Sequence, residues 1–236
     1  MHRTASADPF LSANVTDVSF ACCKGLYGDG NEAGVAGFGR RDQSLPMQIN
    51  KRAGLAPEFS YCLPSAAFFG RVSSYVYVVQ PIGQLETLTE IPQTKLYYKM
   101  NGEYSFKVTN ITIAGEVLKH PIMMGVSTTQ KYTTLQAGVY EAFREQFRRA
   151  VDYEQTAMRK VAPFDTCFNT TYLYLRQPSP SVRLMGPIVG LLNEGEVSWS
   201  LLPETVLAWP KGSGSPLACM AFLKAKQKQM SVLGWF

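Results

Sequence analysis

Alternation between apolar and polar residues predicts β-strands along most of this chain. The clearest run is Tyr104–Ile113, which alternates, reaches the turn signal Ala114-Gly115 and returns through Val117. Shorter runs of the same kind are residues 58–65, 74–79 and 230–236. These patterns favour a chain made mainly of β-strands.

A helical period occurs only in two places. Between Ala137 and Val151, the apolar residues Val139, Phe143 and Phe147 fall on one face, which predicts a helix packed on a sheet. A second, short helix is predicted to begin after Ser44, with Ser44 as N-cap and Pro46 in the first turn, and to run through Ile49. The expected fold class is therefore mainly β.

Composition narrows the class of protein without naming a function. The chain has 236 residues, 46% hydrophobic and 17% charged, with a net charge of +5, which is ordinary for a globular protein. The densest basic cluster is Lys224, Lys226 and Lys228. No nucleic-acid motif accompanies it, so a solvated face is expected. No apolar run approaches the roughly 20 residues of a membrane span, so neither nucleic acid nor membrane is expected as a partner.

Cysteines and glycosylation sequons point to a location outside the cytosol. Three sequons are present, with acceptors Asn14, Asn110 and Asn169, and there are five cysteines, an odd number that leaves at least one thiol unpaired within the chain. Residues 1–9 lack the apolar core of a signal peptide. Secretory features without a signal lead us to expect that the beginning of a longer protein is missing.

Neither a metal nor a cofactor is expected. The two histidines, His2 and His120, are isolated, and no Cys-x-x-Cys spacing is present. The glycine-rich stretch 25–34 lacks the following helix and the Lys-Ser/Thr pair of a phosphate loop. The Gly-x-x-Gly-x-Gly spacing of residues 34–39 has no βαβ unit around it, so a dinucleotide site is set aside.

Two separated motifs carry a family resemblance. Residues 34–48 read Gly-Val-Ala-Gly-Phe-Gly-Arg and then Ser-Leu-Pro-Met-Gln, and residues 59–63 read Phe-Ser-Tyr-Cys-Leu. This series resembles the end of the first lobe of plant pepsin-like aspartic proteases, in order and spacing. The resemblance implies a pepsin-like acid-protease fold, of which this chain holds the end of the N-terminal lobe and most of the C-terminal lobe. The expected division is 1–93 and 94–236.

The second half continues the resemblance. The strand pair 104–117 and the helix 137–151 match the family's second lobe, and residues 161–167, Val-Ala-Pro-Phe-Asp-Thr-Cys, are most similar to the xylanase-inhibitor branch. In the family, that cysteine pairs with one in a strand that here reads Ala-Cys-Met-Ala-Phe, residues 218–222. The resemblance therefore implies a disulfide between Cys167 and Cys219, and it places the partner of Cys62 beyond Phe236.

The catalytic residues of the family are missing. Aspartic proteolysis needs two carboxylates that share a proton around one water, each from an Asp-Thr/Ser-Gly turn. No such tripeptide occurs in this chain, and the resemblance aligns the second-lobe Asp with Gly125, leaving only Thr128 and Thr129 of that turn. No catalytic residue is therefore expected.

Other residues do not replace that dyad. Asp29 and Asp42 lie in expected turns, and Asp165 matches a structural position beside the disulfide. A serine mechanism through Ser127 and His120 lacks the Gly-x-Ser-x-Gly elbow.

Three functional hypotheses follow, and they differ in class. The first is an extracellular homologue that has lost proteolysis and binds or inhibits a microbial glycosidase such as a xylanase. The second is an aspartic-type endopeptidase, binding a peptide, that is incomplete in this chain. The third is a gene-model fragment without a stable function, because a missing lobe would expose a large apolar face.

Overall fold

The structure is a computed structural model. It describes residues 15–21, 35–62, 66–71, 75–79, 85–90, 93–98, 102–151, 160–170, 186–210, 217–226 and 229–234. The chain forms two compact units, Met1–Ile91 and Pro92–Phe236. That the first unit is the remnant of an N-terminal lobe stays a prediction. None of the described helices is long and apolar enough to cross a membrane.

Where the structure describes the first unit, it has one helix and two strand pairs. Its elements are α1 (Leu45–Ala53), β1 (Phe59–Cys62), β2 (Ala66–Phe69), β3 (Tyr75–Val79) and β4 (Leu85–Glu90). Strand β1 pairs antiparallel with β2, and β3 with β4.

Helix α1 begins where the sequence predicts and ends later. Ser44 is the N-cap residue, but its side chain makes no capping hydrogen bond. The helix continues to Ala53 because Gly54 provides the left-handed C-cap, with φ of +64°. The Gln48 side chain accepts a hydrogen bond from the backbone N–H of Ser19 at 2.7 Å and donates one to the Ser19 carbonyl at 3.0 Å. An extended segment is thus fixed to the helix.

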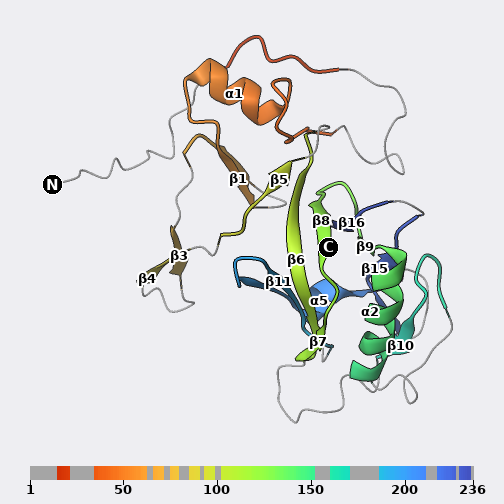
Figure 1. Cartoon of the computed structure of the whole chain (residues 1–236). Coiled ribbons are helices and arrows are strands. Elements are labelled where there is room, and N and C mark those ends of the chain that lie inside the picture. The colour runs from red at the N-terminus through yellow and green to blue at the C-terminus, as the bar shows by residue number, and fades with distance from the viewer. Residues whose placement is uncertain are drawn as a thin grey trace. The chain divides into compact units, whose positions relative to one another are not determined.

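The second unit holds most of the described strands and two of the described helices (Figure 1). Its elements are β5 (Tyr97–Tyr98), β6 (Tyr104–Ile113), β7 (Glu116–Leu118), β8 (Ile122–Val126), β9 (Thr133–Leu135), α2 (Ala137–Ala150), β10 (Cys167–Asn169), β11 (Val189–Asn193), β12 (Ser198–Leu201), α5 (Pro203–Val206), β13 (Leu207–Ala208), β14 (Leu217–Met220), β15 (Phe222–Lys224) and β16 (Ser231–Leu233).

A nine-stranded mixed sheet organises this unit. Its main order is β12-β11-β6-β8-β16-β9-β15, with β5 and β7 also pairing with β6. The predicted hairpin of β6 and β7 is confirmed, and its turn has positive φ at Ala114 and Gly115, as two-residue hairpins require. Strand β16 lies between β8, to which it is parallel, and β9. The predicted mainly β class is confirmed.

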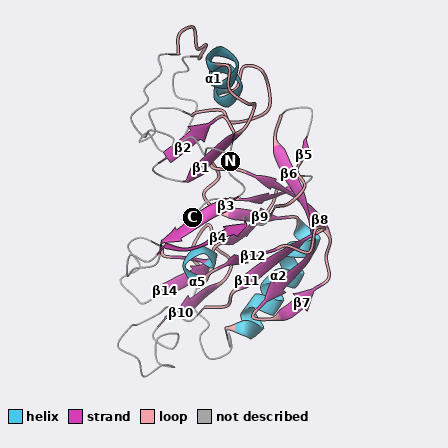
Figure 2. Cartoon of the chain, turned by 90° about the vertical axis from the view of Figure 1, so that its left-hand side faces the viewer, coloured by secondary structure: helices cyan, strands magenta, loops and turns pink. Residues whose placement is uncertain are grey.

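Helix α2 covers one face of this sheet (Figure 2). The predicted helix is confirmed: it runs from Ala137 to Ala150, and Val139, Phe143 and Phe147 are buried. These side chains share a core with Phe106, Val108, Ile111 and Ile113 of β6, and the Phe143 ring centroid lies 4.4 Å from that of Phe222. Burial of an apolar stripe of this kind stabilises a helix more than its intrinsic propensity does.

Candidate functional site

The segment expected to hold the second catalytic turn is a strand followed by a turn. Gly125 lies inside β8, opposite Ser105 of β6 and Val232 of β16, and is buried. A Cβ atom added there would lie 2.8 Å from Cε of Met230. The expectation that Gly125 stands in a turn is wrong, because the five residues from Ile122 to Val126 are all paired strand. The turn after the strand begins at Ser127.

Ser127 builds this turn with its own hydroxyl. Its backbone N–H donates to the Leu233 carbonyl at 3.0 Å, which continues the pairing with β16 by one residue. Its Oγ accepts hydrogen bonds from the backbone N–H groups of Thr129 at 3.3 Å and Gln130 at 3.2 Å, and lies 3.2 Å from Thr129 Oγ1. Serine commonly bonds in this way to backbone two and three residues ahead. Thr128 and Thr129 are exposed.

The residues after this turn are hydrogen-bonded to one another and to Gly234, which follows β16. Gln130 Nε2 donates to the Tyr132 carbonyl at 2.8 Å and to Thr134 Oγ1 at 3.1 Å. The backbone N–H of Gly234 donates to the buried Thr133 Oγ1 at 3.2 Å. A Cβ on Gly234 would lie 2.6 Å from the Gln130 carbonyl oxygen, so only glycine allows this close approach.

The turn carries hydroxyl and amide groups and no carboxylate. From Val117 to Gln136 the sequence contains neither Asp nor Glu. Within the described residues, no group of three or more His, Cys, Asp or Glu side chains could hold a metal ion. His120 is exposed. A serine hydroxyl cannot replace a carboxylate that shares a proton at acid pH, because it does not ionise there.

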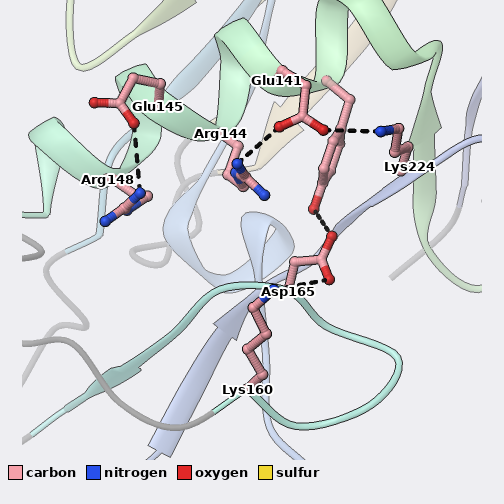
Figure 3. Close-up of polar contacts among 8 residues, drawn as sticks. Glu141, Arg144, Glu145, Arg148, Lys160, Asp165 and Lys224 are labelled. Carbon is pink, nitrogen blue, oxygen red and sulfur yellow. Dashed lines mark hydrogen bonds and ion pairs between the residues drawn. The ribbon is translucent and has the colours of Figure 1, made fainter.

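A charged cluster lies beside helix α2 (Figure 3). Glu141 pairs with Arg144 at 2.8 Å and with Lys224 of β15 at 3.0 Å. Tyr140 is fully buried, and its hydroxyl donates to Asp165 Oδ2 at 2.9 Å, with Lys160 at 4.0 Å from Asp165 Oδ1. Burial, followed by the hydrogen bond to Asp165, raises the pKa of the Tyr140 hydroxyl far above its ordinary value. Asp165 therefore links helix α2 to the segment before Cys167.

A second polar group lies where β5 and β6 approach the β11–β12 turn. The Tyr97 hydroxyl donates to Glu194, and Lys107 Nζ lies 3.6 Å from the other carboxylate oxygen. The hydrogen bond from Tyr97 holds the pKa of Glu194 below its usual value. Sequence analysis missed both this group and the Tyr140–Asp165 pair, since each joins residues far apart in the chain and neither has a local signal.

The structure contains the disulfide that the resemblance implied. Cys167 of β10 and Cys219 of β14 are directly opposite in register, and their sulfurs are bonded. Both residues are fully buried. Cys22, Cys23 and the side chain of Cys62 lie outside the described residues, so their predicted pairing is untested.

The remaining predicted residues are scattered. Asn110 lies in β6 and Asn169 ends β10, both half-buried, whereas Asn14 lies outside the described residues. Of the basic cluster, Lys224 pairs with Glu141, Lys226 is exposed and Lys228 lies outside the described residues.

Two family models match the chain. The model described as Xylanase inhibitor C-terminal matches residues 103–236, and the one described as Xylanase inhibitor N-terminal matches residues 3–72. The first alone covers more than half of the chain.

Curated relatives are plant proteins. The chain is 30% identical over 210 residues to Gamma conglutin 1 of Prunus dulcis, covering 82% of this chain and 45% of the relative. It is 29% identical over 222 residues to Basic 7S globulin 2 of Glycine max, covering 85% and 49%. The chain thus spans about half the length of the curated relatives it matches.

A solved structure shares the fold. The crystal structure of Basic 7S globulin from soybean superposes with a TM-score of 0.66 at 22% identity, covering 89% of this chain and 53% of the soybean chain. The similarity supports the pepsin-like fold that the sequence predicted, as does the match to both family models. The chain belongs to the xylanase-inhibitor family of pepsin-like proteins.

Proposed function

We propose that this chain is a non-proteolytic member of its family that binds a secreted microbial glycoside hydrolase, such as a xylanase, and inhibits it in the plant apoplast. The observation that supports this is the turn after β8. It begins at Ser127, whose hydroxyl already accepts two backbone hydrogen bonds, and it offers no carboxylate. Membership of the xylanase-inhibitor family supports the class of partner.

The chemical reason is that the two carboxylates of an aspartic protease act as a unit. One takes a proton from the attacking water while the other donates one to the peptide carbonyl. General acid–base assistance supplies about 10²–10⁴-fold in rate, and removing one member of such a unit costs nearly as much as removing all. We therefore expect no proteolytic turnover from a chain without an Asp-Thr-Gly or Asp-Ser-Gly turn.

The activity test is cleavage of denatured globin at about pH 3–5, near the reference pKa values of carboxyl groups. We expect no cleavage by highly purified protein and no tight binding of a statine-type transition-state analogue. The variants Gly125→Asp and Ser127→Asp should both stay inactive, because each adds a single carboxylate. Turnover that a statine abolishes would overturn the non-proteolytic assignment and favour the endopeptidase hypothesis.

The partner test is separate. Reducing-sugar release from xylan by microbial xylanases is measured with increasing amounts of the purified chain, and binding is measured by calorimetry. We expect a saturable loss of xylanase activity that heat-unfolded protein does not cause. If no xylanase in a panel binds the chain or loses activity, a xylanase is not its partner. That result would not bear on the loss of proteolysis, which the globin assay tests.

A further inference from the structure

The sheet face opposite helix α2 has a distinct chemistry around Asn110. Phe106, Val108, Ile111 and Ile113 of β6 point into the core and are fully buried. Asn110 and Thr112 alternate with the last two of these and are half-buried. They therefore lie on the other face of the strand.

On one side of β6, strands β11 and β12 extend this face, and β12 contributes two small hydroxyl side chains. Thr112 is opposite Gly190 of β11, which is opposite Ser200 of β12. In the next row on the same face, Asn110 is opposite Leu192, which is opposite Ser198. Both serines are exposed. The apolar side chains of the two rows are Leu192 and, on the other side of β6, the exposed Val117 of β7, which is opposite Thr112.

Gly190 forms the floor of the surface. A Cβ added to it would lie 2.3 Å from Thr112 Oγ1 and 3.3 Å from Ser198 Oγ. The hydroxyls of Thr112 and Ser198 thus occupy the space on this face where a side chain at position 190 would lie. The result is a surface of hydroxyl groups next to Asn110, with Leu192 as its directly opposite neighbour on β11.

The side-chain amide of Asn110 is available for modification. Within the described residues, it makes no hydrogen bond, and it begins the sequon Asn-Ile-Thr. Asn169, by contrast, has an interaction partner, and the Thr171 of its sequon lies outside the described residues. Asn110 therefore combines a sequon, a free amide and an open, polar surrounding.

We propose that Asn110 carries an N-linked glycan whose first sugars lie across the hydroxyl surface formed by Thr112, Ser198 and Ser200. Neighbouring strands are about 4.8 Å apart, so two strand spacings, about 10 Å, bring the first two sugars over both serines. Their hydroxyls can exchange hydrogen bonds with sugar hydroxyls, and Leu192 offers an apolar contact to a sugar ring.

The modification is a group transfer that balances without a redox step. A bond forms between Asn110 Nδ2 and C1 of the first N-acetylglucosamine, and the bond between that carbon and the pyrophosphate of a polyprenyl-linked oligosaccharide donor breaks. Nδ2 loses one proton, and the polyprenyl pyrophosphate leaves. Because Asn110 is half-buried in a central strand, the transfer takes place on the unfolded chain in the secretory pathway. The proposal rests on the apoplastic location included in the proposed function.

The experiment secretes the full chain behind a cleavable leader from a eukaryotic host. Peptide-N-glycosidase in ¹⁸O water converts each glycosylated Asn to labelled Asp, which mass spectrometry locates. We expect the label at residue 110, its loss in Asn110→Gln and Thr112→Ala, and its retention in Thr112→Ser. Asn169→Gln is the matched control and should keep the label at 110. A secreted wild-type protein whose Asn110 peptide is unmodified overturns the proposal, even where a variant fails to fold.

Hydrogen exchange tests where the glycan lies. Peptides covering β12 should exchange more slowly in the glycosylated protein than after native enzymatic deglycosylation. Peptides covering α2, on the opposite face, should not change. Equal exchange of β12 in the two forms would refute the contact with the hydroxyl surface. Because none of these readouts depends on xylanase binding or proteolysis, the proposal can fail separately from the proposed function.

Discussion

The hydrogen bond between Tyr140 and Asp165 makes a quantitative prediction about stability. Tyr140 belongs to helix α2 and is fully buried, and its hydroxyl reaches Asp165 in the segment before Cys167. Replacing Tyr140 with Phe removes this hydroxyl and keeps the ring. The change therefore isolates one polar contact between the helix and the disulfide-bonded strand pair.

The magnitude follows from the charge and exposure of the acceptor. Hydrogen bonds to a charged group are worth about 1.5–3 kcal/mol. The Asp165 side chain is 41% exposed, so water can replace part of the lost bond. We expect Tyr140→Phe to lower the free energy of unfolding by about 1–2 kcal/mol at pH 7.

This difference should shrink in alkali. Burial raises the pKa of Tyr140 in the folded protein, whereas in the unfolded chain the pKa is about 10. Above that pH, the unfolded chain has lost the proton that the folded chain keeps, so wild-type stability falls by at most about 1.4 kcal/mol per pH unit from this group. The Phe variant lacks this part of the fall, and its deficit should therefore decrease between pH 10 and 11.

Urea unfolding followed by tryptophan fluorescence measures the stability of the second unit, which contains Tyr140. All three tryptophans, Trp199, Trp209 and Trp235, belong to the second unit. Tyr132→Phe is a matched control, because the Tyr132 ring packs on Phe164 and, among the described residues, its hydroxyl has no hydrogen-bond partner; it should change stability by less than about 0.5 kcal/mol. A Tyr140→Phe protein as stable as wild type at pH 7, with the same alkaline slope, would refute the reasoning.

Two further predictions concern the sheet and the disulfide. Gly234→Ala should lower the free energy of unfolding by about 1–3 kcal/mol, because its Cβ would meet rigid backbone. Gly125→Ala should lower it less, because only the end of a methionine side chain must move. The urea midpoint of Gly234→Ala should therefore be the lower of the two. Replacing both Cys167 and Cys219 with Ala should cost about 4 kcal/mol in the chain-entropy model for their separation of 52 residues. If reduction of the wild-type protein leaves its urea midpoint unchanged, this estimate is wrong.

Local sequence patterns were sufficient to predict helix α2 and the β6–β7 hairpin. The 3.6-residue period of Val139, Phe143 and Phe147 was enough for α2, and alternation plus Ala114-Gly115 was enough for the β6–β7 hairpin. The pairing of Cys167 with Cys219 could be predicted only from the family resemblance. The cap of α1 was predicted in position but not in detail: Ser44 Oγ is buried and, among the described residues, has no hydrogen-bond partner.

The candidate site could not be read from the sequence in the same way. Gly125 was expected in a turn, because the motif around it was aligned by similarity alone. Its place in β8 depends on Val232, more than 100 residues later in the chain, which pairs with it across a parallel ladder. The turn begins at Ser127, two residues after Gly125, the position to which the resemblance aligned the catalytic Asp. No local rule fixes where a strand ends when its partner strand is remote in the sequence.

Strand β16 has a consequence for the order in which this unit can assemble. It is the strand that joins β8 to β9, yet it leaves the ribosome about 100 residues after Leu135. At synthesis rates of about 5–20 residues per second, the gap between β8 and β9 stays open for about 5–20 s. Until then, the edges of β8 and β9 that face β16 have no partner, although the other edge of β8 can already pair with β6. The central sheet can therefore close only after residues 231–233 have been synthesised, through non-local contacts that make folding slow.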